Sequence, residues 1–366
     1  MSVVSWGLEV AERGWLPDFA IRRAIRRLCA DRLRTLSMVE AGAGEACRAW
    51  IDEMRRSPIA PLPRQANEQH YELPPDFFGL VLGARRKYSC CYWDTTTGNL
   101  EEAEVAALRQ TCEHAQLADG QEILELGCGW GSLSLWMAEQ FPTNRITAVS
   151  NSAPQRRFIE AQACERGLAN LTVLTADMND FAPSPVDGTA ARFDRVVSVE
   201  MFEHMRNWPL LLERISGWLR PAGKLFVHVF CHRSSPYPFE TDGDDNWMGR
   251  HFFSGGQMPS LGQLALCDEH LAVGEQHVWN GRHYQQTSEA WLANLDRRHD
   301  EALTILAKTY GPREAPRRLQ RWRMFFLAVA ELFGFAGGEE WFVAHYLLEH
   351  ADTMNRRQAD NVAVTA

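Results

Sequence analysis

The sequence lacks several features that would place a protein in a specialised class. Its 366 residues contain no run of about 18 uncharged apolar residues, so we expect no transmembrane helix and no integral membrane association. The N-terminal stretch MSVVSWGLEVAERGW has early acids and no basic segment before an apolar core, unlike a secretory signal. A net charge of −9 gives no global basic surface, which argues against a nucleic-acid partner.

Cysteine occurs without a pairing pattern. The nine cysteines are an odd number, are scattered along the chain and form no C-x-x-C pair. They favour neither a disulfide framework nor a zinc site. His228 and His232 make an H-x-x-x-H pattern, but they fall at a strand end, where residues four apart do not converge on one metal ion. The simplest interpretation is a reduced, cytoplasmic protein without bound metal.

The first 75 residues or so are expected to be helical. Between residues 21 and 36 the apolar side chains fall roughly on one face and the arginines largely on another. Such a basic amphipathic helix either lies on an anionic membrane or caps the domain with a solvated, charged face. Because the rest of the chain is acidic, we favour the cap. Pro58, Pro61 and Pro63 then predict a connecting loop over 55–64.

From residue 122 the pattern alternates between strand and helix, which predicts an α/β fold with a parallel sheet and helices on both faces. Ligands bind such sheets at the carboxyl ends of the strands. After residue 230 we expect helices over 287–309 and 316–333, and a turn at 337 into a last strand. The earlier predicted strands are 123–126, 145–150, 171–176, 193–199 and 224–230, with helices over 153–164 and 208–219 and a turn at 221–223.

The stretch EILELGCGWGS at 122–132 is the most informative part of the chain. Gly127, Gly129 and Gly131 follow an apolar strand, and glycine lets the backbone turn tightly and lets a ligand approach closely. A dinucleotide site normally has the spacing G-x-G-x-x-G and binds a pyrophosphate. Here Glu125 precedes the first glycine, and its carboxylate would repel phosphate. It would suit a cationic ligand such as the amino group of S-adenosylmethionine, although the turn could also be purely structural.

Polar side chains follow the next two strands. Ser150, Asn151 and Gln155 follow the second strand, where an acid often binds ribose hydroxyls but only neutral polar groups are available. Asp177 follows the third strand and could accept a hydrogen bond from an adenine amine, with Met178 near the ring. These five residues are candidate cofactor contacts.

Glu200, Glu203 and His204 follow the fourth strand and form the sharpest cluster. Residues three and four apart share a helix face, so we expect Glu200 beside Glu203 or His204. Carboxylates and an imidazole at this edge could take a proton from an amine or hold a cation. Alternatively, Glu203 pairs with an arginine and His204 caps a turn. His228 lies inside the fifth predicted strand, where a histidine is normally a satisfied core residue.

Together these and other motifs resemble the S-adenosylmethionine-dependent methyltransferases that include cyclopropane-fatty-acid synthases and plant benzylisoquinoline-alkaloid N-methyltransferases. The resemblance implies a Rossmann-like class I methyltransferase sheet, with a helical N-terminal cap (1–95), a methyltransferase domain (96–350) carrying an acceptor-site insertion at about 231–335, and a loose tail (351–366). It covers residues 11 to 350 and rests on YSCCYW at 88–93, LELGCGWGSLS at 124–134, AVSNSAPQ at 148–155, VEMFEHM at 199–205, FVHVFCHR at 226–233, NGRHYQQTSEAW at 280–291 and AELFGFAGGEEW at 330–341.

Two branches of that superfamily compete. Cyclopropane synthases hold a bicarbonate as base with Cys, Glu, His and Tyr side chains, and Cys90, Glu203, His228 and Tyr284 resemble those positions. The alkaloid N-methyltransferases are more similar elsewhere, as in the doubled cysteine at 90–91 and the segments DDNW at 244–247 and FFSGGQMPS at 252–260. We therefore expect N-methylation of a small cyclic or aromatic amine. Methylene transfer to unsaturated phospholipid acyl chains is the alternative, and a non-catalytic cofactor-binding scaffold fits poorly because the glycine turn and the acids are intact.

The resemblance to the amine branch also implies residue roles. Tyr71 and Glu72 would line the amine pocket, while Glu200, Glu203 and His204 would orient the amine and remove its proton. A homodimer is a candidate assembly. Aromatic walls would come from Trp322, Phe325 and Phe326, and further cofactor contacts from Tyr88 and Ser89.

Overall fold

The computed structural model describes residues 3–37, 43–62, 73–184, 193–243 and 246–354. Tyr71 and Glu72 therefore lie outside the described residues, as do the two aspartates of the DDNW segment. In the part of the chain that the structure describes, no helix is long and apolar enough to cross a membrane.

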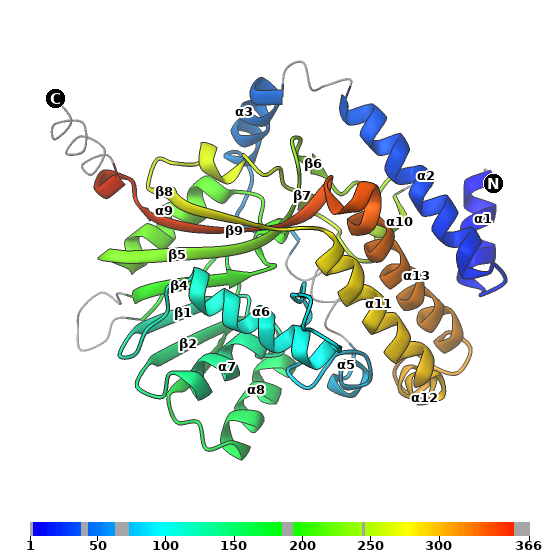
Figure 1. The fold of residues 1–366 in the computed structure, drawn as a ribbon, viewed down its shortest axis with the longest axis horizontal. Coiled ribbons are helices and arrows are strands. Elements are labelled where there is room, and N and C mark those ends of the chain that lie inside the picture. Colours follow the sequence, from blue (N-terminus) through cyan, green and yellow to red (C-terminus); the bar gives the residue numbers. More distant parts are fainter. Residues whose placement is uncertain (1–2, 38–42, 63–72, 185–192, 244–245, 355–366) are drawn as a thin grey trace.

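A seven-stranded sheet forms the centre of the molecule, with strand order β3-β2-β1-β4-β5-β9-β8 (Figure 1). The first five strands in this order are parallel, as predicted, but β9 runs antiparallel to both β5 and β8, so the sheet is mixed. The strands are β1 (Glu122–Leu126), β2 (Arg145–Ser150), β3 (Leu171–Thr175), β4 (Phe193–Val199), β5 (Leu219–His232), β8 (Leu271–Trp279) and β9 (Trp341–His350).

The structure differs from the predicted elements in three places. The expected turn at 221–223 is part of β5, where a register shift between Phe193 and Arg195 of β4 absorbs the extra residues. The helix predicted over 287–309 is two helices, α11 (Arg282–Arg297) and α12 (His299–Tyr310), separated at Arg298. Strand β8 was not predicted, because its middle is an exposed, polar stretch at the sheet edge that lacks apolar alternation.

Helices cover both faces of the sheet, as expected. Neighbouring residues of β1 point to opposite faces. Ile123 packs in a core with helices α6 (Leu100–His114) and α7 (Ser132–Gln140), whereas Leu124 packs in a core with α3 (Ala43–Met54) and α9 (Trp208–Trp218). On the α7 side, α8 (Ala153–Glu165) packs against β3.

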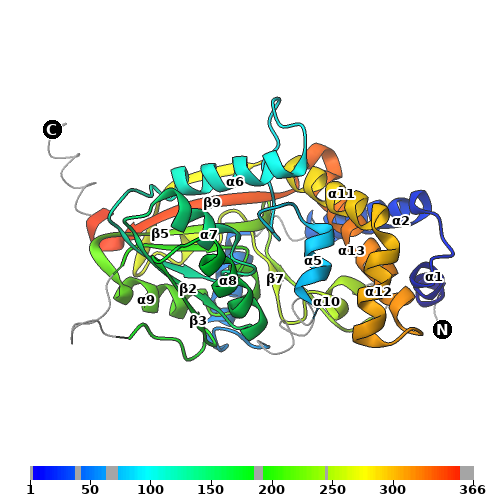
Figure 2. The same ribbon diagram turned by 90° about the horizontal axis from the view of Figure 1, so that it is seen from below.

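The remaining helices gather at one end of the sheet (Figure 2). There α1 (Val3–Glu12) and α2 (Asp18–Ser37) pack on α13 (Ala315–Gly334), which begins with the expected proline in its first turn. Arg22 of α2 donates to Glu289 and Glu331, so part of the arginine-rich face pairs with acids of α11 and α13. Smaller elements are α5 (Pro75–Val81), α10 (Trp247–His251), β6 (Tyr237–Pro238) and β7 (Gln257–Met258).

Candidate active site

The three glycines after β1 have different local tasks. All have positive φ: 79° at Gly127, 52° at Gly129 and 79° at Gly131. A Cβ at the first would lie 2.8 Å from the Met201 Cβ, and at the third 2.6 Å from the Ile159 Cγ1. A Cβ at Gly129 would meet no atom within 4 Å. The outer glycines therefore allow close packing, and the middle one faces open space that a ligand can use.

Two cavities open around this turn, and both are lined by Gly127, Gly129 and Glu200. The first cavity extends over the ends of β2, β3 and β4 and holds about 810 Å³ of empty space, its open mouth included. The second cavity extends over the start of α7 and the loop 86–89, with about 540 Å³ measured in the same way.

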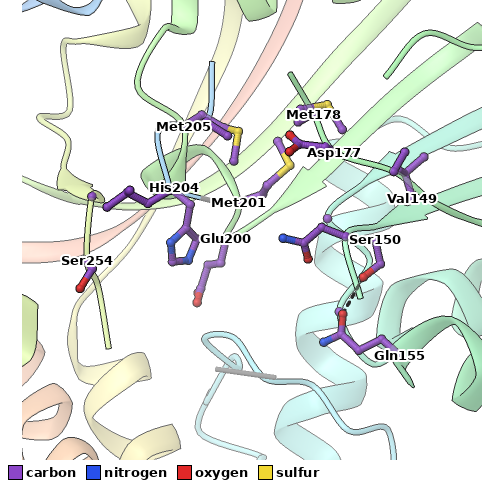
Figure 3. A pocket seen from close by; sticks show the side chains of 17 residues that line it. Val149, Ser150, Gln155, Asp177, Met178, Glu200, Met201, His204, Met205 and Ser254 are labelled. Atoms are coloured by element: carbon purple, nitrogen blue, oxygen red, sulfur yellow. Dashed lines mark hydrogen bonds between the residues drawn. The ribbon is translucent and has the colours of Figure 1, made fainter. Parts of the chain in front are cut away.

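The first cavity collects the polar residues predicted after β2 and β3 (Figure 3). Ser150 donates its hydroxyl to the Gln155 Oε1 at 2.7 Å. The Gln155 Nε2 is buried and finds no hydrogen-bond partner among the described residues, so this amide has a donor available to a ligand. Asn151, Asp177 and Met178 line the same cavity. These side chains fit the hydroxyl and amine groups of a nucleoside.

The second cavity contains the acid that precedes the glycines. Glu125 is 2% exposed, and burial raises the pKa of its carboxyl to about 7 against the opposing effect of a hydrogen bond from Ser134. Tyr88 and Ser89, the further candidate cofactor contacts, line this cavity too. Sequence reasoning missed Ser132, whose buried hydroxyl finds no partner in the described structure although it ends the glycine motif.

Glu200 stands where the two cavities meet, and three distant segments hold its carboxylate. Its Oε1 accepts from the Cys90 backbone N–H at 2.9 Å and contacts the His228 Nε2 at 3.1 Å, while its Oε2 accepts from the Tyr284 hydroxyl at 2.7 Å. The prediction that Glu200 shares a helix face with Glu203 or His204 is wrong. Glu200 has a left-handed φ of 47°, and the short 3-10 helix that follows spans only Phe202–His204.

Of the three predicted catalytic residues, Glu200 and His204 line a cavity and Glu203 does not. Burial raises the pKa of Glu200, and the charge of Lys87 opposes the rise. Burial lowers the pKa of His204 to about 4, so this imidazole is neutral at pH 7 and lines the first cavity with Glu200 (Figure 3). Glu203 lines neither cavity, and burial and the charge of Glu200 raise its pKa far above the ordinary value. In the described structure its Oε2 has no hydrogen-bond partner, and no arginine pairs with it.

The predicted aromatic walls lie in a buried cluster beside the cavities. Phe325 stacks on Phe252 with ring centroids 4.3 Å apart, and Trp322 packs edge-on to the same ring at 5.2 Å. Trp322, Phe325 and Phe326 line neither of the two cavities. No group of three or more His, Cys, Asp or Glu residues suited to a metal ion occurs in the described ranges.

Comparison with known proteins places this geometry in a family. Residues 62–334 match the model of the mycolic acid cyclopropane synthetase family. The chain is 34% identical over 357 residues to (S)-coclaurine N-methyltransferase of Thalictrum flavum subsp. glaucum, which covers 93% of this chain and 94% of the relative. It is 32% identical over 247 residues to the cyclopropane-fatty-acyl-phospholipid synthase of Escherichia coli strain K12, covering 67% of this chain and 56% of the synthase.

Solved structures give the same ranking. The crystal structure of a coclaurine N-methyltransferase bound to N-methylheliamine and SAH (S-adenosylhomocysteine) matches with a TM-score of 0.89 at 32% identity, over 95% of this chain and all of that one. A cyclopropane synthase of Mycobacterium tuberculosis matches with a TM-score of 0.64 at 21% identity, over 78% of this chain and 97% of that one, which supports the fold alone. The chain therefore belongs to the mycolic acid cyclopropane synthetase family, in which it is an S-adenosylmethionine-dependent methyltransferase more similar to the alkaloid N-methyltransferases than to the synthases.

Proposed function

We propose that this methyltransferase N-methylates a small cyclic or aromatic amine, with Glu200 as the group that binds the ammonium form and takes its proton. The observation that carries the proposal is the position of Glu200 at the junction of the two cavities. The names of the coclaurine N-methyltransferase relatives support an amine acceptor.

The residues around the glycine turn fit S-adenosylmethionine. The Gln155 Nε2, which finds no partner among the described residues, and Asp177 would bind the nucleoside part, and the open space at Gly129 would admit the ligand close to the backbone. Glu125 would face the amino group from the second cavity. When bound, the cofactor supplies a methyl group already activated on a sulfonium.

The protein then has to align the amine and keep it neutral, because only a neutral amine has a lone pair for attack. The Glu200 carboxylate attracts the ammonium form and accepts its proton. His204 has a pKa of about 4, so its neutral ring can accept a hydrogen bond from the same amine. Trp322, Phe325 and Phe326 would stabilise a cationic product by cation–π contact if the acceptor reaches their cluster.

The surroundings of Glu200 favour the amine reaction over lipid methylenation. Cys90, His228 and Tyr284 resemble the positions that hold bicarbonate in cyclopropane synthases. Here the Cys90 backbone N–H and the Tyr284 hydroxyl already donate to the carboxyl group of Glu200, and the His228 Nε2 contacts it. A built-in carboxylate would make an added bicarbonate unnecessary.

A screen with methyl-labelled S-adenosylmethionine tests the proposal. Secondary and tertiary cyclic amines and vesicles of unsaturated phospholipid are offered in parallel, with and without bicarbonate. We expect an amine product with one added N-methyl group, formed with loss of a proton from a secondary amine and as a quaternary ammonium from a tertiary one, and a rate that does not change when bicarbonate is removed. A lipid product heavier by one methylene, formed only with bicarbonate, would overturn the proposal in favour of the synthase reaction.

A further inference from the structure

Glu200 is the inner end of a chain of three hydrogen-bonded histidines. The His228 Nε2 contacts Glu200 at 3.1 Å, and the His228 Nδ1 lies 2.9 Å from the His345 Nε2. The His345 Nδ1 lies 2.7 Å from the His114 Nδ1. Both ring nitrogens of His228 and of His345 are thus used in one continuous path.

The chain runs across neighbouring strands to the edge of the sheet. His228 of β5 and His345 of β9 are direct cross-strand partners and are fully buried. His114 lies in the last turn of α6 and is half-buried. Its ring stacks at a centroid distance of 3.9 Å on His277 of the edge strand β8, whose side chain is 42% exposed. The path therefore leads from the buried carboxylate to the exposed edge strand of the sheet.

We propose that His228, His345 and His114 form a proton path through which Glu200 exchanges its proton with solvent while ligands fill the cavities. This inference rests on the proposed role of Glu200 as the proton acceptor. The Glu200 side chain is only 8% exposed, so bound ligands would close its route to water on the cavity side. None of the three histidines lines either cavity, so they act through Glu200.

The proton transfer balances and leaves every histidine of the path neutral. The Glu200 carboxyl gives its proton to the His228 Nε2, and His228 gives the proton on Nδ1 to the His345 Nε2. His345 gives the proton on Nδ1 to the His114 Nδ1, and His114 gives the proton on Nε2 to water. Each imidazole is neutral before and after, because each loses one N–H and gains another.

After this transfer, Glu200 is a carboxylate that accepts a hydrogen bond from the His228 Nε2–H and can take the proton of the ammonium. After the products leave, water in the open cavity removes the proton that came from the amine. The chain then takes a proton back through His114, which restores the first arrangement.

The charges around the path agree with a neutral relay. Burial lowers the pKa of His228 and of His345 well below the ordinary value, and the ammonium of Lys87 lowers both further. The ammonium of Lys87 also faces Glu200, together with the neutral imidazole of His204. A proton is therefore not held within the chain.

The outer end of the path differs from its interior. Burial and the neighbouring His277 lower the pKa of His114 to about 4, although the charge of Glu275 on β8 opposes this shift. Apolar rings cover the interior instead: Trp279 packs 4.2 Å from the His345 ring and Phe226 at 5.1 Å. These rings exclude water from the path between its two ends.

The test follows the carboxyl of Glu200 directly. The protein is saturated with SAH, jumped to higher pH, and the infrared carboxyl band that is missing in Glu200→Gln is recorded with time. We expect His345→Leu and His114→Phe to slow the loss of this band by about 100-fold while SAH affinity and melting temperature stay near the wild-type values. In His114→Ala, added imidazole should restore the rate.

Several outcomes would overturn the proposal. One is an unchanged rate in His114→Phe. This variant keeps an aromatic ring stacked on His277, so it tests the path even if the buried variant His345→Leu misfolds. A second is a failure of imidazole to rescue His114→Ala. A third is an equal slowing in the control His350→Gln, which changes an exposed histidine of β9 bonded to the Arg220 carbonyl. The measurement needs no methyl acceptor, so its result is independent of whether the amine is the substrate.

Discussion

At the scale of single residues, the character of Glu200 is set by the groups that hold it. Burial alone would favour the neutral acid, since a charge is disfavoured in an apolar environment. Hydrogen bonds from Cys90 and Tyr284 and the charge of Lys87 act in the opposite direction. The balance gives a carboxyl whose pKa is raised but that can still ionise, which suits a proton acceptor.

Replacing Glu200 with glutamine tests its charge without changing its size. We expect methyl transfer to fall by about 100- to 10,000-fold, because the ammonium would lose both its partner and its proton acceptor. SAH affinity, measured by calorimetry, should be nearly unchanged. Glu203→Gln is the matched control and should lose much less activity, because Glu203 lines neither cavity. Equal losses in both variants would show that Glu200 has no special role.

Tyr284→Phe tests the pH dependence of the same group. The acceptor works as a carboxylate, so wild-type activity should fall as the pH drops through the raised pKa of Glu200. Phenylalanine removes the hydroxyl that donates to the anion, so that pKa should rise and the acid limb of kcat/KM should move up by about one pH unit. Tyr346→Phe removes a buried hydroxyl that donates to the Leu261 carbonyl instead, and its limb should not move. A shift to lower pH in Tyr284→Phe would contradict the assignment.

At the scale of elements, the turn between the β1 strand and the α7 helix forms the proposed cofactor site. The turn leaves the middle glycine beside open space, while its neighbours are in tight contact with Met201 and Ile159. Strand ends of β2, β3 and β4 supply the polar side chains around it. This agrees with ligand binding at the carboxyl edge of a parallel sheet.

Gly129→Ala separates the ligand-binding role of this turn from its role in folding. The new Cβ would occupy space next to the cavity, so we expect SAH affinity to fall by about tenfold. Gly120→Ala is the control, because Gly120 also has a positive φ and a Cβ there also meets nothing within 4 Å. Both variants should lose about 1 kcal/mol of stability from the left-handed backbone. Only Gly129→Ala should lower SAH affinity. An equal loss of affinity in Gly120→Ala would contradict a ligand-binding role for Gly129.

At the scale of the whole molecule, charged contacts attach the N-terminal helices to the C-terminal ones. Glu12 of α1 accepts hydrogen bonds from Trp247 of α10 at 2.8 Å and from Arg317 and Arg321 of α13 at 2.6 and 2.9 Å. Two segments more than 200 residues from α1, the helices α10 and α13, thus depend on one buried carboxylate. The domain limits, a homodimer and a cytoplasmic location stay predictions.

Glu12→Gln tests this attachment through its pH dependence. Burial pushes the pKa of Glu12 up, but the hydrogen bonds from Arg321 and Trp247 prevail and lower it to about 2. A carboxyl with a lowered pKa stabilises the fold above its unfolded pKa, and this stability is lost as the pH falls toward about 2. The variant should therefore be less stable at pH 7 by on the order of 3 kcal/mol.

Thermal melting at several pH values checks that expectation. The difference between wild type and Glu12→Gln should shrink as the pH falls below the ordinary range of a glutamate. Glu9→Gln removes a partner of Arg317 at an exposed position and should change the melting temperature much less. A difference that does not depend on pH would argue against an ionised Glu12.

Much of the fold could be predicted because it depends on local pattern. The apolar runs of β1 and β2 and the proline at the start of α13 define their elements without reference to the rest of the chain. Strand β8 could not be predicted, because pairing with β9, rather than its own polar sequence, makes it a strand. The same applies to the two ends of β5, which extend along β4 and β9.

The sequence by itself determined the class of protein and predicted where its cofactor binds, because Glu125, the glycine turn and Asp177 each lie within a few residues of a strand end. Tertiary structure decided which acid is the candidate proton acceptor. The partners of Glu200 lie 110, 28 and 84 positions away in the sequence, and only folding brings their donors to one carboxylate. Its proton affinity, and the histidine path behind it, depend on burial and on long-range hydrogen bonds, which belong to the packed molecule and not to any stretch of the chain.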